Sequence, residues 1–286
     1  MSQESGATYN PDAIAQHFDA YGRQEWDRLV ATPVDEVSLY IHSHYLKKYV
    51  PAGARVLEIG AGAGRFTQIL AGLGARIVVA DISQVQLDLN KRFAQEYRFD
   101  HAVEERQQVD ICRIDQFADA SFDCVVAYGG PLSYVLNLRD TALQECWRVL
   151  RVNGTLLLSV MALWGSAHRA LKGVLLGTPV EVNRRITETG DLSPETFPGR
   201  EASAMHLFRS AELRRWLGQR GWTILALSAS NCLSTAWDDL LTEIRDDGER
   251  WAELLRMELE ACAEEGAVDM GTHLIAVACK AQEAGG

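Results

Sequence analysis

The stretch Val56-Leu57-Glu58-Ile59-Gly60-Ala61-Gly62-Ala63-Gly64-Arg65-Phe66 decides the fold. It reads as a short buried strand that runs into a glycine-rich loop and then opens a helix. Because glycine has no side chain, the backbone N–H groups of such a loop can approach a ligand closely. A second apolar strand follows and ends at Asp81, whose carboxylate can bind two ribose hydroxyls. The pattern predicts an adenosine-binding site and leaves open which adenosine cofactor it takes.

Strands and helices alternate from this point onward, which predicts a parallel sheet with crossover helices. Asn153-Gly154 predicts a turn before the fifth strand. Ser210 is expected to cap a helix over 211–219. Residues 162–208 show only weak periodicity, and a long stretch without a clear element is usually functional or mobile. The expected strands are 55–59, 76–80, 105–109, 122–127, 155–160, 223–227 and 273–279.

Composition limits the function classes. Of 286 residues, 47% are hydrophobic and 23% are charged, which is ordinary for a soluble globular protein. No apolar run approaches the ~18 residues of a membrane span, and the polar start does not resemble a signal peptide, so we expect a cytoplasmic protein without membrane contact. The net charge of −11 argues against nucleic acid as a partner. The six cysteines form no CxxC pair, which favours buried thiols over disulfides or a metal site.

Three carboxylates narrow the choice of cofactor. Glu58 lies two residues before Gly60, where a loop that holds a pyrophosphate would not carry a group that repels anions. A carboxylate there suits a ligand with an ammonium or sulfonium group. Ile82 follows Asp81 and offers an apolar contact for adenine, and Asp110 ends the third strand, where it can accept from an adenine amino group.

These pieces resemble the class I S-adenosylmethionine-dependent methyltransferases. The resemblance covers roughly residues 50–160 and rests on several motifs at the family's spacing: 56–64, 79–83, Asp110, 121–126 and 145–154. It implies an α/β, Rossmann-like three-layer sandwich whose seven-stranded sheet is mostly parallel, with an antiparallel last strand. It also implies S-adenosyl-L-methionine as cofactor and S-adenosyl-L-homocysteine as product. We therefore expect an N-terminal helical lid over 1–50 and a methyltransferase domain over 51–286, with a substrate or lid insertion at about 162–208.

The same resemblance implies roles for individual residues. Asp110 could instead be a turn residue. The aromatic residues Tyr21 and Trp26 of the expected lid, 1–50, could instead pack in the core. The implied cofactor contacts are Glu58, Gly60, Ala61 and Gly62 around the methionine part, Asp81 at the ribose, Ile82, Asp110 and Ile111 at the adenine, the carbonyls of Ala127, Tyr128 and Gly129 at the ammonium, and Tyr21 from the lid.

Methyl transfer needs a base only if the acceptor loses a proton. The candidates are His206, His168 and Tyr134, and both histidines have an alternative structural role. The segment 129–134 lies where the family builds its acceptor pocket, and it lacks the Asn/Asp-Pro-Pro-aromatic signature of amino-group methyltransferases of DNA or protein.

The sequence thus favours an enzyme that methylates an O or N atom of a small molecule, with a homodimer left open. Two alternatives remain within the fold, namely a methyltransferase acting on protein or RNA and a non-catalytic protein that binds the cofactor. A nicotinamide oxidoreductase is disfavoured by Glu58 and by the antiparallel ending.

Overall fold

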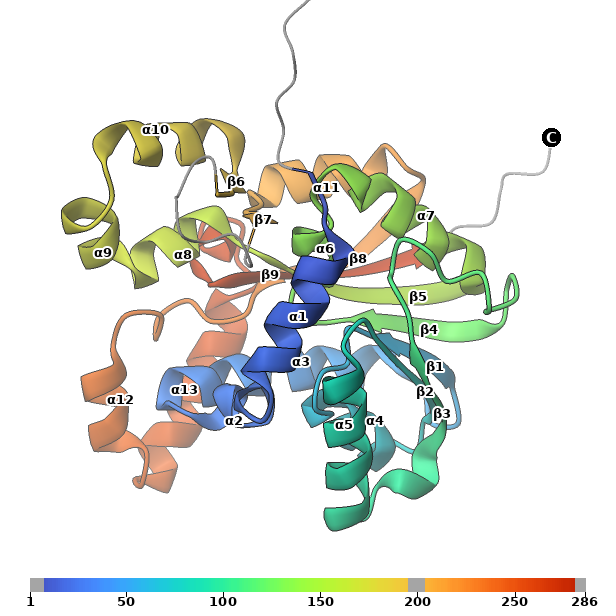
Figure 1. The fold of residues 1–286 in the computed structure, drawn as a ribbon. Coiled ribbons are helices and arrows are strands. Elements are labelled where there is room, and N and C mark those ends of the chain that lie inside the picture. The colour runs from blue at the N-terminus through green and yellow to red at the C-terminus, as the bar shows by residue number, and fades with distance from the viewer. Residues whose placement is uncertain (1–7, 195–203, 281–286) are drawn as a thin grey trace, which may run out of the picture.

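A computed structural model describes residues 8–194 and 204–280. Its main feature is a seven-stranded sheet in the order β3-β2-β1-β4-β5-β9-β8 (Figure 1). Strands β1 to β5 pair in parallel, whereas β9 runs antiparallel to both of its neighbours, β5 and β8. This confirms the predicted fold class. The strands are β1 (Arg55–Ile59), β2 (Arg76–Asp81), β3 (Val103–Gln108), β4 (Phe122–Ala127), β5 (Leu150–Met161), β8 (Trp222–Ala229) and β9 (His273–Lys280).

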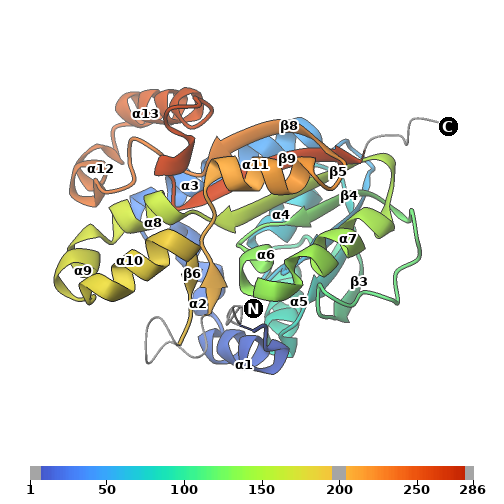
Figure 2. The same ribbon diagram turned by 90° about the horizontal axis from the view of Figure 1, so that it is seen from above.

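Helices cover both faces of the sheet and make three layers (Figures 1 and 2). Side chains of β1 alternate between the faces, so that Leu57 packs in one apolar core and Val56 in the other. The first core is closed by α7 (Arg139–Val149) and α11 (Ser210–Gly218). The second is closed by α3 (Pro33–Tyr49), α4 (Arg65–Gly72), α5 (Gln84–Glu96) and α13 (Gly248–Ala261), with α12 (Asp238–Ile244) before α13.

The N-terminal segment crosses the sheet on the side where the parallel strands end. Helix α1 (Pro11–Tyr21) is capped by Asn10, whose side chain accepts from the N–H of Ala13 at 3.1 Å. It contacts α5, and its Phe18 ring meets the Tyr134 ring of α6 (Pro131–Tyr134) edge-on at 5.7 Å. The short helix α2 (Gln24–Asp27) then leads to α3. The segment therefore lies above the loops that follow β1, β2 and β4.

The segment 162–208 has more regular structure than its periodicity predicts. Its described part forms α8 (Leu163–Arg169), α9 (Leu171–Leu176), α10 (Val180–Thr189) and a small hairpin of β6 (Asp191–Leu192) and β7 (Met205–His206). The expectation that it lacks a clear element was wrong. The reason is that α9 and α10 bury no residue fully and Leu175 and Leu176 are exposed, so apolar positions do not mark one buried face.

Two local predictions need correction. Strand β5 begins at Leu150 rather than at Thr155, because Asn153-Gly154 bulges within the strand while its pairing with β4 shifts. Ser210 is the first residue of α11 rather than its cap, and its N–H and hydroxyl both donate to Asp269. Within 8–194 and 204–280, the helices are too short or too polar to cross a membrane.

Candidate functional site

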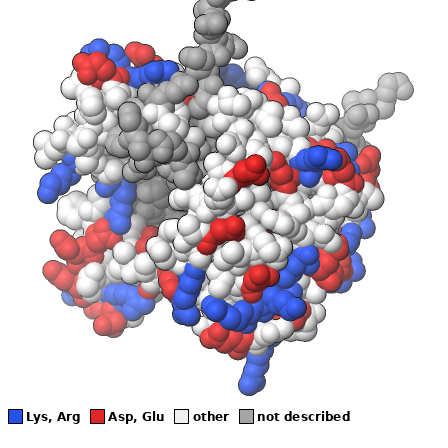
Figure 3. All heavy atoms as spheres, viewed as in Figure 1, with Lys and Arg blue, Asp and Glu red and all other residues white. Residues whose placement is uncertain are grey.

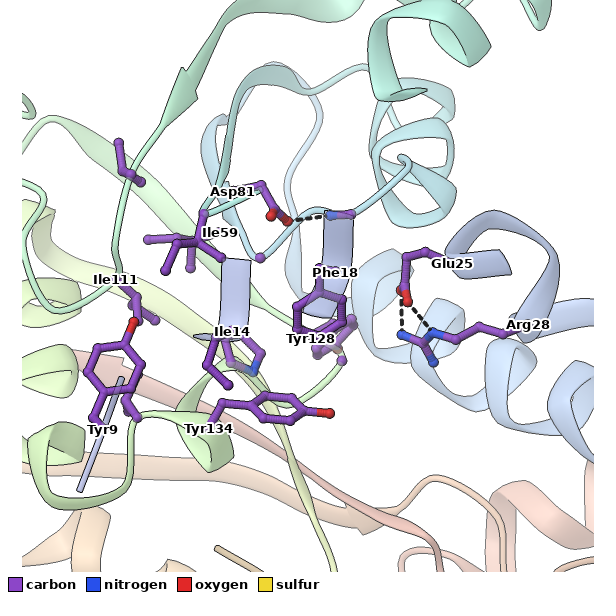
Figure 4. Close-up of a pocket in the computed structure, with 17 residues that line it drawn as sticks. Tyr9, Ile14, Phe18, Glu25, Arg28, Ile59, Asp81, Ile111, Tyr128 and Tyr134 are labelled. Atoms are coloured by element: carbon purple, nitrogen blue, oxygen red, sulfur yellow. Dashed lines mark hydrogen bonds and ion pairs between the residues drawn. The ribbon is translucent and has the colours of Figure 1, made fainter. Parts of the chain in front are cut away.

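A pocket of about 630 Å³, part of it open to solvent, lies at the carboxyl ends of β1, β2 and β4 (Figure 4). In an α/β sheet this is the edge where ligands bind. The pocket floor is the glycine loop and the tips of the strands, and its roof is α1 with α2. It is lined by Tyr9, Ile14, Phe18, Glu25, Arg28, Ile59, Gly60, Gly62, Asp81, Ile82, Val109, Ile111, Tyr128, Gly129, Pro131, Tyr134 and Val135.

Asp81 joins the pocket to the glycine loop. One carboxylate oxygen accepts from the N–H of Gly62 and the other from the N–H of Ser83, each at 2.8 Å. Gly62 has a φ of 54°, a conformation that favours glycine. Burial raises the pKa of Asp81 to about 6. The carboxylate thus holds the loop in place and keeps free lone pairs at the pocket.

Glu58 lies under the loop instead of in the pocket. Its neighbour Ile59 faces the pocket, so the alternation of the strand turns Glu58 toward α4, where the hydroxyl of Thr67 donates to it at 2.6 Å. Its other carboxylate oxygen is buried without a hydrogen-bond partner among the described residues. Burial, with the nearby charge of Asp81, raises its pKa to about 8. The structure therefore does not bring Glu58 together with the pocket residues.

Apolar residues form the wall beyond Asp81. Ile82, Val109 and Ile111 line it, whereas Asp110 does not. The carboxylate of Asp110 accepts from the N–H of Cys112 at 2.8 Å, as a turn residue does. Burial is the main cause that raises the pKa of the Tyr9 hydroxyl, and the nearby carboxylate of Asp110 raises it further. Asp110 therefore lies behind the wall, beside Tyr9.

The end of β4 contributes Tyr128 and Gly129, while Ala127 before them is fully buried and Ala61 lines a smaller cavity beside the loop. The N–H of Gly129 donates to the hydroxyl of Ser159 at 2.9 Å. The Tyr128 hydroxyl is buried without a partner in the described part of the chain. Burial raises its pKa well above the usual value, so the hydroxyl stays neutral.

Helix α2 and the residue after it supply a charged pair that the sequence reasoning missed. Both carboxylate oxygens of Glu25 meet the guanidinium of Arg28, at 2.7 Å in each case (Figure 4). A helix of four residues is too short for periodicity, and the sequence gives no signal for this contact. Tyr21 and Trp26 do not line the pocket: Tyr21 stacks on His17, and Trp26 is buried against Phe93.

Of the three candidate bases, the structure brings only Tyr134 to the pocket, and burial raises the pKa of its hydroxyl. His206 lies outside, with Nδ1 at 2.7 Å from Asp191 and Nε2 at 2.7 Å from Glu212. Both ring nitrogens are thereby engaged, so His206 has no free lone pair to act as a base. His168 lies on α8, half-buried and away from the pocket lining.

The comparisons with known proteins agree with this geometry. Residues 57–158 match the model of a methyltransferase domain. The chain is 31% identical over 114 residues, or 38% of its length, to the mitochondrial ubiquinone biosynthesis O-methyltransferase of Mus musculus, and the match spans only 29% of that relative. It is 25% identical over 242 residues to the tRNA 5-carboxymethoxyuridine methyltransferase of Escherichia coli K12, covering 81% of this chain and 82% of that one.

A solved structure shows the same fold. The 1,6-didemethyltoxoflavin-N1-methyltransferase of Burkholderia thailandensis, with 1,6-didemethyltoxoflavin and S-adenosylhomocysteine bound, matches with a TM-score of 0.56 at 17% identity. The match covers 95% of this chain and 88% of that one. Residues 57–158 match a methyltransferase domain, and together with the sheet order and the glycine loop held by Asp81 this supports a class I S-adenosylmethionine-dependent methyltransferase.

Proposed function

We propose that the chain transfers a methyl group from S-adenosylmethionine to an O or N atom of a small molecule. The observation that carries the proposal is a glycine loop fixed by Asp81 at the floor of a partly covered pocket with aromatic side chains in its lining. Asp81 would hold the ribose, and Ile82, Val109 and Ile111 would hold the adenine. The loop with Gly60 and Gly62 would hold the methionine part, opposite Tyr128 and Gly129 of the β4 end.

Arg28 extends this assignment. Among the pocket-lining residues in 8–194 and 204–280 it is the single Lys or Arg, and its guanidinium nitrogen Nη2 would be 3.2 Å from a Cβ added at Gly129. A guanidinium in that place suits the carboxylate of the methionine part. The glycines support the fit as well, because a side chain at Gly60 would meet Pro131 at 3.0 Å and fill the cradle.

The chain's own contribution to the reaction is alignment and exclusion of water. The sulfonium supplies a methyl group that is already activated, so an oriented acceptor is the main requirement. Phe18, Ile14 and Tyr134 would cover the acceptor side. With its raised pKa, Tyr134 stays protonated near neutral pH and would donate a hydrogen bond to the acceptor. His206, with both nitrogens bonded, would take no part.

Charge and enclosure favour a small acceptor. The net charge is −11, and the face shown in Figure 3 interleaves acidic and basic side chains without a continuous basic track. RNA remains the second candidate because the tRNA methyltransferase of Escherichia coli matches over 81% of this chain.

Two measurements test the proposal. Calorimetry should show micromolar binding of S-adenosylhomocysteine and no binding of NAD, and binding of NAD alone would contradict it. The protein is then incubated with methyl-labelled S-adenosylmethionine and, separately, with the small-molecule filtrate and the RNA fraction of a cell extract. Label in the filtrate supports a small-molecule acceptor, whereas label in RNA supports the second candidate. Cofactor binding without label in either fraction would favour a protein acceptor or a non-catalytic role.

A further inference from the structure

The carboxylate of Glu25 lies against the backbone of the glycine loop. A Cβ added at Gly62 would be 2.8 Å from Cγ of Glu25 and 3.3 Å from its Oε1. The close approach is therefore allowed only because Gly62 has no side chain. The Glu25 side chain is 13% exposed, so it reaches from α2 into the pocket and lies against the floor instead of extending into solvent.

Arg28 contacts Glu25 on the side away from the glycine loop. Its guanidinium bonds both oxygens of Glu25 and packs against Gly129, and its side chain is 29% exposed. An acid and a base thus bridge the loop after β1 and the loop after β4. This is the space that the proposed function gives to the methionine part of the cofactor, which itself carries one carboxylate and one ammonium.

A cofactor carboxylate that pairs with Arg28 would meet the carboxylate of Glu25 at the same guanidinium. Like charges that share one site repel each other, and a guanidinium fork matches one carboxylate at a time in the bidentate geometry. The two carboxylates therefore compete. We propose that Glu25 is an internal competitor that occupies the methionine end of the cofactor site and is exchanged for the cofactor's carboxylate on Arg28; this rests on the proposed function.

The neighbouring structure confines the exchange to the Glu25 side chain. Trp26 is 3% exposed, stacks on Phe93 at 4.4 Å and lies under the Arg65 guanidinium at 3.9 Å. Arg65 also donates to the Trp26 carbonyl at 2.7 Å. The backbone of α2 is therefore held in place, and rotation of the Glu25 side chain is the movement that vacates the site.

The test compares two ligands on variants of the full chain. S-adenosylhomocysteine has the amino-acid end, whereas 5′-methylthioadenosine keeps the adenosine and the sulfur but lacks it. Glu25→Gln keeps the shape and removes the charge, and Glu25→Ala removes the side chain. Both variants should bind S-adenosylhomocysteine about tenfold more tightly than the wild type, about 1.4 kcal/mol. Their affinity for 5′-methylthioadenosine should not change.

The matched control is Asp27→Asn on the same helix, where an exposed carboxylate pairs with Arg23 at 3.2 Å and does not line the pocket. It should leave both affinities unchanged. Unchanged or weaker binding of S-adenosylhomocysteine by Glu25→Gln would overturn the proposal, the weaker case meaning that Glu25 binds the cofactor. If the wild type binds no S-adenosylhomocysteine at all, the proposed function fails, which is a different result from failure of the competition.

Discussion

Replacing Asp81 with alanine is expected to weaken cofactor binding strongly while changing the free energy of unfolding only a little. The carboxylate is buried and accepts two backbone N–H groups, from Gly62 and Ser83, each at 2.8 Å. Two ribose hydroxyls would add two further bonds to a charged acceptor, each worth about 1.5–3 kcal/mol. Water entering the truncated site replaces part of this, so we expect a net loss of about 3 kcal/mol. That corresponds to about a hundredfold weaker binding.

The effect on stability should be smaller. Burial raises the pKa of Asp81 to about 6, above its usual 3.8. The folded state therefore holds the proton more tightly than the unfolded state, and the charged carboxylate costs stability as the pH rises through this range. Removing the charge offsets much of the loss of the two N–H partners. We expect Asp81→Ala to change the free energy of unfolding by about 1 kcal/mol or less.

Calorimetry with S-adenosylhomocysteine and urea unfolding measure the two quantities. Asp123→Asn is the control, since Asp123 also accepts a backbone N–H at 2.8 Å, from Arg55, at the opposite edge of the sheet. It should leave the cofactor affinity unchanged. An Asp81→Ala variant that binds S-adenosylhomocysteine within about threefold of the wild type, less than 1 kcal/mol, would refute the role of Asp81 in holding the ribose.

Three further predictions concern pH, the loop and the insertion. Because the Asp81 pKa is about 6 and the ribose requires the charged carboxylate, wild-type affinity for S-adenosylhomocysteine should fall as the pH decreases through 6, and calorimetry of Asp81→Asn should show no such fall. Gly62→Ala and Gly53→Ala both place alanine at positive φ (54° and 77°), so each should lose about 1–2 kcal/mol in urea unfolding. Only Gly62→Ala should also lose cofactor affinity, because a Cβ at Gly53 meets nothing within 4 Å. Burial lowers the pKa of His206, but its bonds to Asp191 and Glu212 outweigh this and raise it above 6.5. Its contribution to stability is present below pH 6.5 and lost as the pH rises through the folded pKa, so the pH slope of unfolding should flatten in His206→Gln.

The glycine loop and the strands around it were predictable because their signals are local. Three of the four residues from Val56 to Ile59 are apolar, and Gly60 follows them directly. Asp81 ends the next strand, so each of these elements is marked by residues that are close together in the sequence. The orientation of the Glu58 side chain, which points away from the pocket, also follows from local geometry. Strand side chains alternate, and once Ile59 faces the pocket Glu58 faces the other side.

Contacts between distant segments were beyond the sequence. Glu25 and Arg28 reach the loop only because α1 and α2 fold over β1 and β4, and nothing in their own residues marks this. His206 was a candidate base, yet it pairs with Asp191, fifteen residues earlier, in a hairpin whose strands have only two residues each, and the sequence does not mark so short a pairing. Residues 195–203, within the predicted insertion, lie outside the described residues.

The position of β9 bears on the order in which the chain can fold. Strand β8 joins the sheet only through β9, which is synthesised some forty residues later and lies between β5 and β8. During synthesis, β1 to β5 can assemble among themselves, whereas β8, which α11 contacts, lacks its pairing strand until residues 273–280 have left the ribosome. Until then β5 presents an open, apolar edge, and that edge is where a partly made chain is most exposed to aggregation.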